Sequence, residues 1–439
     1  MSNVWPLSAT RDSDGALSIG GVDVRDAAAT FGTPLFLLDE ADIRSRARAY
    51  REAAQHVGAS RVYYAAKAFL STAVAQWVHE EGLGIDVASG GELAVALRAG
   101  VPGADLLLHG NNKSMLEIET AMSAGVARIV VDSFEEIVRV ADAAARAGLV
   151  QPVLVRLTIG VEAHTHEFIA TAHEDQKFGF SVSSGAAEEA IRRIVKLPSL
   201  EFRGLHSHIG SQIFDTDGFE EAAIRIVGFI DRLRTDQVVD VPELDLGGGM
   251  GIAYLPSDDP LSISDLASHV AQVVSQECAR RELTVPALSF EPGRAIVGPA
   301  GVTIYEVGTV KPVAIDAGVR TYVSVDGGMS DNIRTALYDA KYTVELASRT
   351  STAEPMLVRV VGKHCESGDI VIREAYLPSD LVPGDLLAVA ATGAYCRSMA
   401  SNYNYLPKPA VVGVMNGIPS VVLRRETIED MLALDPGAQ

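Results

Sequence analysis

The sequence predicts an α/β protein, in which a (β/α)8 TIM-type barrel is followed by an all-β domain. Between about residue 34 and residue 300, short β-prone runs alternate with helical patterns, which indicates a parallel sheet. Eight such units over roughly 265 residues match the usual size of a (β/α)8 barrel. After residue 300 the runs become short, β-branched and separated by turns, as in an all-β domain.

Each barrel strand is expected where a short apolar run stands between turn signals. An open, doubly wound sheet would show one dominant glycine-rich turn near its start. Here distinctive residues follow several different strands, which favours the closed barrel. The eight expected strands are residues 62–66, 84–87, 106–108, 128–131, 153–158, 202–206, 244–246 and 288–290.

The β domain is expected to take in the N-terminal segment as well, because residues 16–19 resemble a strand. One helical stretch is expected near residues 331–346. The expected organisation is an N-terminal segment over 1–33, a barrel over 34–300 and a β domain over 301–439. The expected β-domain strands are residues 302–310, 322–325, 357–361, 386–391, 411–414 and 420–423.

Composition excludes several classes of partner. With 37 basic and 57 acidic residues the formal net charge is −20, which disfavours nucleic acid. No uncharged apolar run approaches the length of a membrane span. The three cysteines form no CxxC pair, and the N-terminus lacks a secretory pattern. We therefore expect a cytoplasmic protein that acts on a small molecule.

The residues that follow the barrel strands form a chemically coherent set. Because the carboxyl ends of parallel strands meet at one face of a barrel, these side chains are expected to converge. The first of them is expected to be a partly desolvated amine, which suits a Schiff-base nucleophile. The set comprises Lys67, Asp86, the segment 206–212, the glycines 247–249 and the segment 291–294.

A phosphate pocket is expected opposite Lys67. Three successive glycines, Gly247, Gly248 and Gly249, let backbone amides approach an anion, and Arg294 offers a bidentate contact. Barrels often bind phosphate with the loops after strands seven and eight. A lysine facing a phosphate site points to pyridoxal 5′-phosphate (PLP), with Glu291 facing the pyridine nitrogen and His208 stacking on the ring.

Several motifs carry a resemblance to a known family. The chain resembles the diaminopimelate decarboxylases of the alanine-racemase-like PLP fold, a family that also contains ornithine and arginine decarboxylases. The resemblance extends from about Thr33 to Val414 and implies a PLP barrel, a β domain and a homodimer with shared active sites. The matching motifs are Tyr64-Ala-Ala-Lys-Ala-Phe69, His206-Ser-His-Ile-Gly-Ser-Gln212, Glu291-Pro-Gly-Arg294, Cys365-Glu-Ser-Gly-Asp369 and Thr392-Gly-Ala-Tyr-Cys-Arg-Ser-Met399.

The resemblance implies a role for each matching residue. Lys67 would hold the cofactor covalently, His208 would stack on its ring, and Cys365 would be the proton donor, contributed by the partner subunit. The implied cofactor-binding residues are Lys67, Asp86, His208, Ser211, Gly248, Gly249, Glu291, Gly293, Arg294 and Tyr395.

Substrate choice is expected to depend on the segment 330–338. Arg334 and Tyr338 are four apart, so on a helix they share one face, and Arg334 suits a carboxylate at the far end of the substrate. Glu366 could pair with the distal ammonium. A cation and an anion at the far end suit the second amino-acid group of meso-diaminopimelate, whose decarboxylation gives L-lysine and CO2. Arg294, Arg334, Tyr338, Glu366 and Tyr395 form the expected substrate site.

Two other functions stay open from the sequence. Ornithine and arginine decarboxylases hold a cationic side chain with acidic groups at that position. A catalytically inactive relative would act as a binding protein, although Lys67, Cys365 and the glycine turn are all present. A racemase of this fold places an arginine at the pyridine nitrogen, so Glu291 favours a decarboxylase.

Two further features complete the sequence analysis. His164, His166 and His173 lack the spacing of metal ligands on a helix, so no metal site is expected and contacts over the active site are favoured. The family usually has proline after the glycine that precedes the cysteine motif, whereas this chain reads Gly362-Lys-His-Cys365. That departure concerns the stiffness of the loop and not its chemistry.

Overall fold

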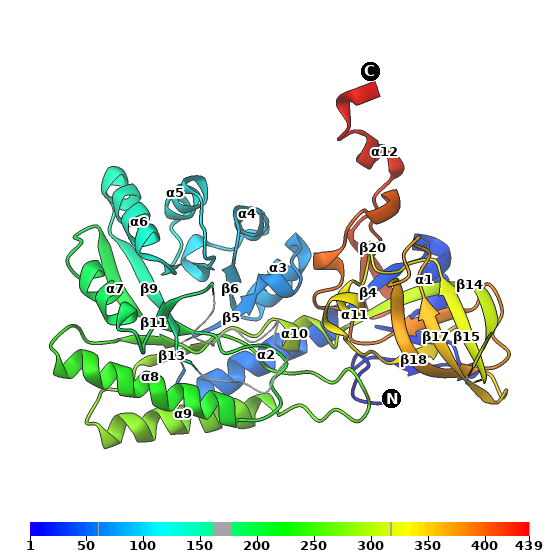
Figure 1. Ribbon diagram of the computed structural model, residues 1–439, viewed down its shortest axis with the longest axis horizontal. Coiled ribbons are helices and arrows are strands. Elements are labelled where there is room, and N and C mark those ends of the chain that lie inside the picture. The colour runs from blue at the N-terminus through cyan, green and yellow to red at the C-terminus, as the bar shows by residue number, and fades with distance from the viewer. Residues whose placement is uncertain (60, 161–176, 317, 439) are drawn as a thin grey trace. The chain divides into compact units, whose positions relative to one another are not determined.

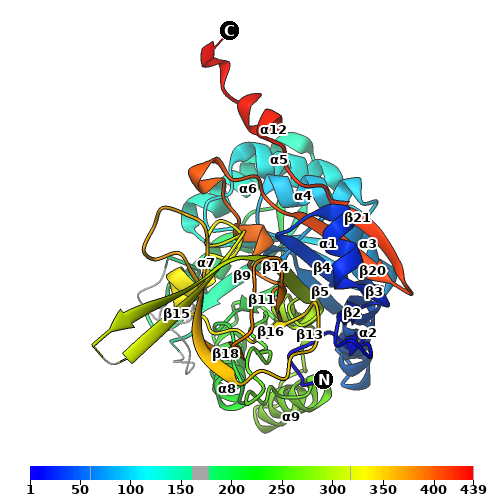
Figure 2. The ribbon, with the colours of Figure 1, turned by 90° about the vertical axis from the view of Figure 1, so that its right-hand side faces the viewer.

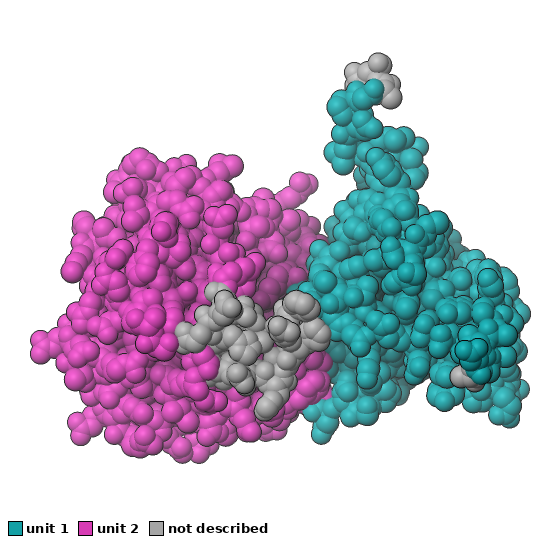
Figure 3. Space-filling model, in the orientation of Figure 1, with its two compact units in different colours: residues 1–45, 252–259, 294–439 teal, residues 46–251, 260–293 magenta. Residues whose placement is uncertain are grey.

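The structure is a computed structural model that describes residues 1–59, 61–160, 177–316 and 318–438. The chain divides into two compact units, which Figure 3 shows in different colours. Unit 1 comprises residues 1–45, 252–259 and 294–439, and unit 2 comprises residues 46–251 and 260–293.

Unit 2 is a closed parallel barrel (Figure 1). Among the described residues, eight parallel strands close the ring, and the last of them, β13, pairs with the first, β5. β10 (Phe180–Ser181) adds to β9 outside that ring. The barrel strands are β5 (Arg61–Ala65), β6 (Gly84–Val87), β7 (Leu106–Leu108), β8 (Arg128–Val131), β9 (Gln151–Thr158), β11 (Leu200–Ser207), β12 (Glu243–Asp245) and β13 (Ala287–Phe290).

Helices surround the barrel strands, and serines begin several of them. Ser71, Ser89, Ser114 and Ser133 each accept a hydrogen bond from a backbone N–H in the first turn of the following helix. These caps end the βα loops at defined points, directly beyond the strand ends. The helices are α2 (Glu40–His56), α3 (Thr72–Glu80), α4 (Gly90–Arg98), α5 (Met115–Ala124), α6 (Phe134–Ala147), α7 (Ala186–Ile194), α8 (Asp217–Thr235) and α9 (Ile263–Arg280).

Unit 1 is built mainly of β-strands (Figure 2). Its largest sheet has the order β18-β17-β15-β14-β4-β20-β21, and β19 joins it by pairing with β14 and β16. The strands are β4 (Leu35–Asp39), β14 (Gly301–Ile315), β15 (Gly318–Val325), β16 (Val344–Leu346), β17 (Pro355–Val361), β18 (Ile370–Pro378), β19 (Leu386–Val389), β20 (Ala410–Met415) and β21 (Ile418–Leu423).

The N-terminal segment packs into the core of unit 1. Its strands β1 (Thr10–Arg11), β2 (Leu17–Ile19) and β3 (Val22–Asp23) form a small sheet of their own. Leu17 and Ile19 nevertheless lie in one buried cluster with Leu37, Val302 and Val412. The unit's remaining helices are α1 (Val24–Phe31), α10 (Arg294–Val297), α11 (Arg334–Tyr338) and α12 (Ile428–Leu432).

The predicted fold class is confirmed, and the differences lie in the β domain. The eight barrel strands and the six expected β-domain strands are all present. The helix expected near residues 331–346 is wrong for most of that range, because only 334–338 are helical and Val344–Leu346 pairs with β19. Residues 35–39 fall in the range assigned to the barrel, but they form β4, a strand that was not expected and that pairs with β14 and β20. In the described parts of the chain, no helix combines the length and apolarity needed to span a bilayer.

Candidate active site

The carboxyl ends of the barrel strands bring titratable side chains together in unit 2. Asp86 lies on β6, His109 follows β7, and His206 lies on β11. Glu291 follows β13, which pairs with β5 and so stands beside the strand that precedes Lys67. This is the convergence that the sequence predicted from the barrel topology.

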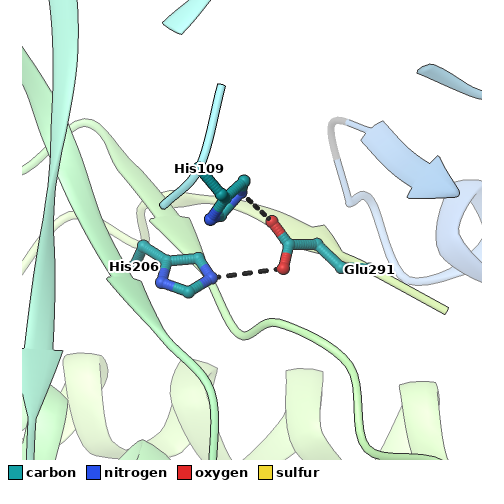
Figure 4. Close-up of side chains that lie close together, drawn as sticks. All are labelled: His109, His206 and Glu291. Atoms are coloured by element: carbon teal, nitrogen blue, oxygen red, sulfur yellow. Dashed lines mark hydrogen bonds and ion pairs between the residues drawn. The ribbon is translucent and has the colours of Figure 1, made fainter. Parts of the chain in front are cut away.

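Glu291 lies between two histidines (Figure 4). His109 Nε2 is 2.8 Å from Glu291 Oε1, and His206 Nε2 is 3.2 Å from Oε2. All three residues are buried. The two imidazole rings meet edge to face, with centroids 4.8 Å apart. The carboxylate is therefore fixed in one orientation from two sides.

The charges in this cluster favour an ionised Glu291. Burial alone would raise the pKa of its carboxyl, but His109 and His206 outweigh burial and hold that pKa well below its ordinary value. Burial likewise opposes a charge on His109, yet Glu291 and Asp86 raise its pKa. Burial lowers the pKa of His206 to about 4, so His206 is neutral at physiological pH. These shifts favour a Glu291 carboxylate and the protonated form of His109.

Asp86 and Asp245 are two further buried carboxyl groups of the same unit. Burial, reinforced by Glu291, raises the pKa of Asp86 to about 7. The same two causes raise the pKa of Asp245 well above its ordinary value. Asp245 is held in place because its Oδ1 accepts the Gly247 N–H at 2.8 Å. Both shifts favour the protonated, neutral form of these two carboxyl groups beside Glu291.

Lys67 differs from its expected environment. It lies in a single 3-10 turn, Ala66–Ala68, directly after β5. Its two neighbours, Ala66 and Ala68, are buried, while the Lys67 side chain is exposed within the chain. The expectation of a partly desolvated amine is therefore not met within this chain, where the side chain of Lys67 is exposed.

The glycine turn after β12 is required by close backbone packing. A Cβ on Gly247 would lie 2.6 Å from the Ser207 carbonyl oxygen, and one on Gly248 would lie 2.3 Å from the Glu291 carbonyl oxygen. The Gly248 N–H donates to His208 Nδ1 at 3.2 Å. Glycine thus lets this turn approach both β11 and β13, which positions the buried His208 ring.

His208 is held in its neutral form. Burial, reinforced by the nearby Lys67 charge, lowers the pKa of His208 well below its ordinary value. Since Nδ1 accepts from Gly248, the proton of the neutral ring is on Nε2. Ser211 lies three residues further on in the same loop, half-buried. Gly293, in the loop after β13, is packed so closely that a Cβ would lie 2.9 Å from the Ala65 oxygen.

A second cluster of candidate residues lies in unit 1. Arg294 and Arg334 are both buried, and each donates through Nη1 to the hydroxyl of Tyr254, Arg334 at 3.0 Å. Arg334 also donates to the Tyr342 hydroxyl. Among the described residues, no carboxylate forms an ion pair with Arg334. Tyr254, through its single oxygen, links two guanidinium groups.

One of the two tyrosines predicted for this cluster, Tyr395, lies against Arg294, and the other, Tyr338, lies at the end of α11. The Arg294 guanidinium lies 4.6 Å from the ring centre of Tyr395, so these two predicted neighbours are brought together. Tyr338 is half-buried at the end of α11, but the phenols that contact Arg334 are Tyr254 and Tyr342. The helical spacing predicted Tyr338 as the neighbour of Arg334. It could not predict Tyr254 or Tyr342, because both lie outside α11, which is only five residues long.

Cys365 and Glu366 lie side by side in an exposed loop between β17 and β18. Cys365 is the exposed cysteine of the three, since Cys278 and Cys396 are buried. Glu366 Oε1 accepts the Gly368 N–H at 3.2 Å, which keeps the loop tight. His164, His166 and His173 lie outside the described residues.

Sequence reasoning did not assign His109, Tyr254 or Tyr342. His109 follows the third barrel strand, and its position at a strand end was the available signal. Ligand atoms of His109, His206 and Glu291 lie within 4.8 Å of one another, a spacing that a metal ion could use. Each carboxylate oxygen instead faces one imidazole nitrogen.

Comparisons with known families cover most of the chain. Residues 40–298 match the model described as "Pyridoxal-dependent decarboxylase, pyridoxal binding domain". Residues 213–393 match the model described as "Pyridoxal-dependent decarboxylase, C-terminal sheet domain". The first match includes the strand ends that carry Lys67 and Glu291, and the second includes the loop of Cys365.

Relatives and solved structures agree with those matches. Diaminopimelate decarboxylase of Mycobacterium tuberculosis (strain ATCC 25618 / H37Rv) is 56% identical over 438 residues, 99% of this chain and 98% of that protein. The enzyme of that name from Bacillus subtilis (strain 168) is 46% identical over 97% of this chain and 96% of its own length. The crystal structure of diaminopimelate decarboxylase from M. jannaschii in complex with L-lysine aligns with a TM-score of 0.91 and 31% identity, covering 98% of both chains. The chain therefore belongs to the pyridoxal-dependent decarboxylase family.

Proposed function

We propose that this protein is a PLP-dependent carboxy-lyase that converts meso-diaminopimelate to L-lysine and CO2, the last step of lysine biosynthesis. The observation that carries this proposal is the fixed, ionised Glu291 at the barrel strand ends, in a chain 56% identical to a diaminopimelate decarboxylase. A carboxylate suits a protonated pyridine nitrogen, which makes the bound ring an electron acceptor.

The residues of unit 2 fit such a cofactor. Among the described residues, Glu291 Oε1 has an ion-pair contact with His109 but no aligned hydrogen bond, so it can accept one from a ring N–H. Lys67 would hold the aldehyde covalently through its accessible amine. His208 would stack on the ring as a neutral imidazole, and Asp86 lies beside Glu291. Ser211, Gly248, Gly249 and Gly293 of the same unit would surround the phosphate.

Protonation follows loss of CO2. The bond between Cα and its carboxylate carbon would break and CO2 would leave without the bonding electrons. PLP, when bound, would supply the electron sink for the pair that stays behind. Cys365 would then donate its thiol proton to Cα, and solvent would return a proton to the sulfur. Cys365 lies in an exposed loop, which fits a donor that serves the active site of a second subunit.

The far end of the substrate would be held by Arg334 with Tyr338, Arg294 and Tyr395, while Glu366 meets its ammonium. A buried guanidinium that contacts only neutral groups within the described chain favours a carboxylate ligand. Ornithine and arginine carry no carboxylate at that end, so their decarboxylation is less well supported.

A decarboxylation assay tests both the reaction and the role of Arg334. We expect PLP-dependent CO2 release from meso-diaminopimelate and little from L-lysine, ornithine or arginine. In Arg334→Lys, which keeps the charge but loses the planar fork, kcat/KM for meso-diaminopimelate should fall about 100-fold. The loss should lie mainly in KM, because binding energy at the far end is removed.

An exposed arginine provides the matched control, since Arg373→Lys on β18 should leave kcat/KM unchanged. Turnover of ornithine or arginine in preference to meso-diaminopimelate would overturn the proposed substrate. Equal KM in the wild type and Arg334→Lys would remove the far-end contact from the proposal.

Shared active sites give a second prediction. If Cys365 serves the opposite subunit of a homodimer, mixing inactive Lys67→Ala and Cys365→Ala proteins produces heterodimers with one intact site. Equal mixing and full exchange should restore about a quarter of wild-type activity. Exchange is measured by native mass spectrometry of the mixture. Heterodimers that form but stay inactive would place both residues in the same chain's site.

A further inference from the structure

The loop that carries Cys365 is held at its base by a neighbouring segment of unit 1. The Cys365 side chain is exposed, yet its backbone N–H donates to Asn404 Oδ1 at 3.3 Å. His364, the preceding residue, is buried, and its Nδ1 lies 3.2 Å from the same oxygen. One amide oxygen therefore binds both residues at this point of the loop.

The other contacts of His364 determine where its proton lies. Asn404 Oδ1 is an acceptor, so His364 Nδ1 carries the hydrogen. The remaining nitrogen, Nε2, lies 2.9 Å from Ser330 Oγ and in the neutral ring accepts from that hydroxyl. The Tyr403 ring stacks on the imidazole, with centroids 5.2 Å apart and planes 23° from parallel. Ser330, His364 and Asn404 thus form one connected chain of hydrogen bonds that ends at Cys365.

The backbone supports this arrangement on both sides. Asn404 has φ 54° and ψ 26°, a left-handed conformation that asparagine adopts more readily than most residues. On the loop itself, Asp369 Oδ2 accepts the His364 N–H at 2.8 Å, and Asp369 Oδ1 accepts the Met329 N–H at 2.6 Å. A Cβ on Gly362 would lie 2.3 Å from Asp369 Oδ2, so a glycine is needed there. The loop base is therefore tied on each side of Cys365.

We propose that His364 and Asn404 are positioning residues for Cys365, which they orient through its backbone while its thiol stays exposed. The inference rests on the proposed function, in which Cys365 donates a proton to Cα. Fixing the Cys365 N–H restrains the backbone conformation that sets the direction of the Cα–Cβ bond, and so the region that Sγ can reach. Proton transfer is sensitive to displacements of about 1 Å, so a loop released at this point donates poorly and from a less defined direction.

Substitutions at residue 404 can remove the hydrogen-bond acceptor Oδ1 without changing the left-handed backbone conformation at that position. Asn404→Gly removes Oδ1 and keeps a residue that tolerates positive φ. Asn404→Asp keeps both the acceptor and the tolerance, and serves as the conservative rescue. Asn402→Ser is the matched control, because the Asn402 amide donates to Glu426 and Leu406 and not to the Cys365 loop. His364→Phe, which retains a ring against Tyr403, is the second variant if Asn404→Gly does not fold.

The first measurement uses the holoenzyme with meso-diaminopimelate in D2O. We expect kcat of Asn404→Gly to fall about 10-fold with KM nearly unchanged. The deuterium in the product lysine should change from a single configuration to a mixture, because solvent can then protonate from either side. A merely structural role would reduce the amount of active enzyme without altering configuration. Asn404→Asp and Asn402→Ser should retain the single configuration.

The second measurement needs no substrate. Cys365 is the exposed cysteine, so its alkylation by iodoacetamide can be followed by peptide mass spectrometry against the buried Cys278 and Cys396. Asn404→Gly should change the rate at Cys365 several-fold, and Asn402→Ser should not. Unchanged rate and unchanged configuration in a folded Asn404→Gly or His364→Phe protein would overturn the inference. Absence of lysine formation by the wild type, with the rate change intact, would instead overturn the proposed function alone.

Discussion

Replacing Lys67 by alanine should abolish covalent cofactor attachment and lower kcat/KM at least about 1000-fold. Lys67 stands in the turn directly after β5, and its side chain is exposed. Without it, PLP can bind only through its phosphate and ring contacts. Borohydride reduction of the wild type, followed by peptide mapping, should place the label on the peptide that contains residue 67.

The matched control is Lys196→Ala, an exposed lysine that precedes β11 and so lies near the amino end of a barrel strand. It should retain wild-type activity and labelling. Label on another lysine of the wild-type protein, or an active Lys67→Ala protein, would contradict the assignment. Because Lys67 is exposed, its removal should change the melting temperature little, and circular dichroism checks that the variant is folded.

Glu291→Gln should lower kcat about 100-fold while the protein still binds PLP. Glutamine keeps the volume of glutamate but cannot offer a negative charge to a protonated pyridine nitrogen. The two histidines hold the pKa of Glu291 well below its ordinary value, so the wild-type group is ionised throughout the neutral range. The expected loss therefore reflects the charge and not a change in titration.

The visible absorption spectrum and kcat are measured together for this variant. Glu243→Gln is the matched control, since Glu243 pairs with Arg128 and Arg203 at the start of β12. That change should leave kcat unaltered, with any cost limited to stability. An unaltered kcat in Glu291→Gln would mean that another group faces the pyridine nitrogen.

The places of the candidate catalytic residues at the strand ends could be predicted because they are local in sequence. Lys67, Gly248 and Glu291 each stand where an apolar run ends, and the ends of parallel strands meet at one face of a barrel. His109 occupies an equivalent position after β7, but a single histidine carries no signal of its own. Only the closed ring shows that His109 and His206 reach the same carboxylate.

The helical spacing at Arg334 shows the limit of local patterns. A period of 3.6 residues places Tyr338 on the same face, and it also predicts a longer helix than the five residues observed. The contacts of Arg334 come from Tyr254, 80 positions away, and from Tyr342, which lies beyond the helix. A pattern of neighbouring residues cannot predict contacts between side chains that come from separate segments of the chain.

By itself the sequence determined the alternation of strands and helices, the β-rich ending and the residues that end each strand, because these depend on periodicity and turn chemistry. Tertiary structure decided which of those residues touch and which are charged. Burial and the distances between charged groups determine that Glu291 is ionised and that His208 is neutral, and the packing around the turn leaves Lys67 exposed. Those quantities depend on groups far apart in the chain, and they exist only once the barrel has closed.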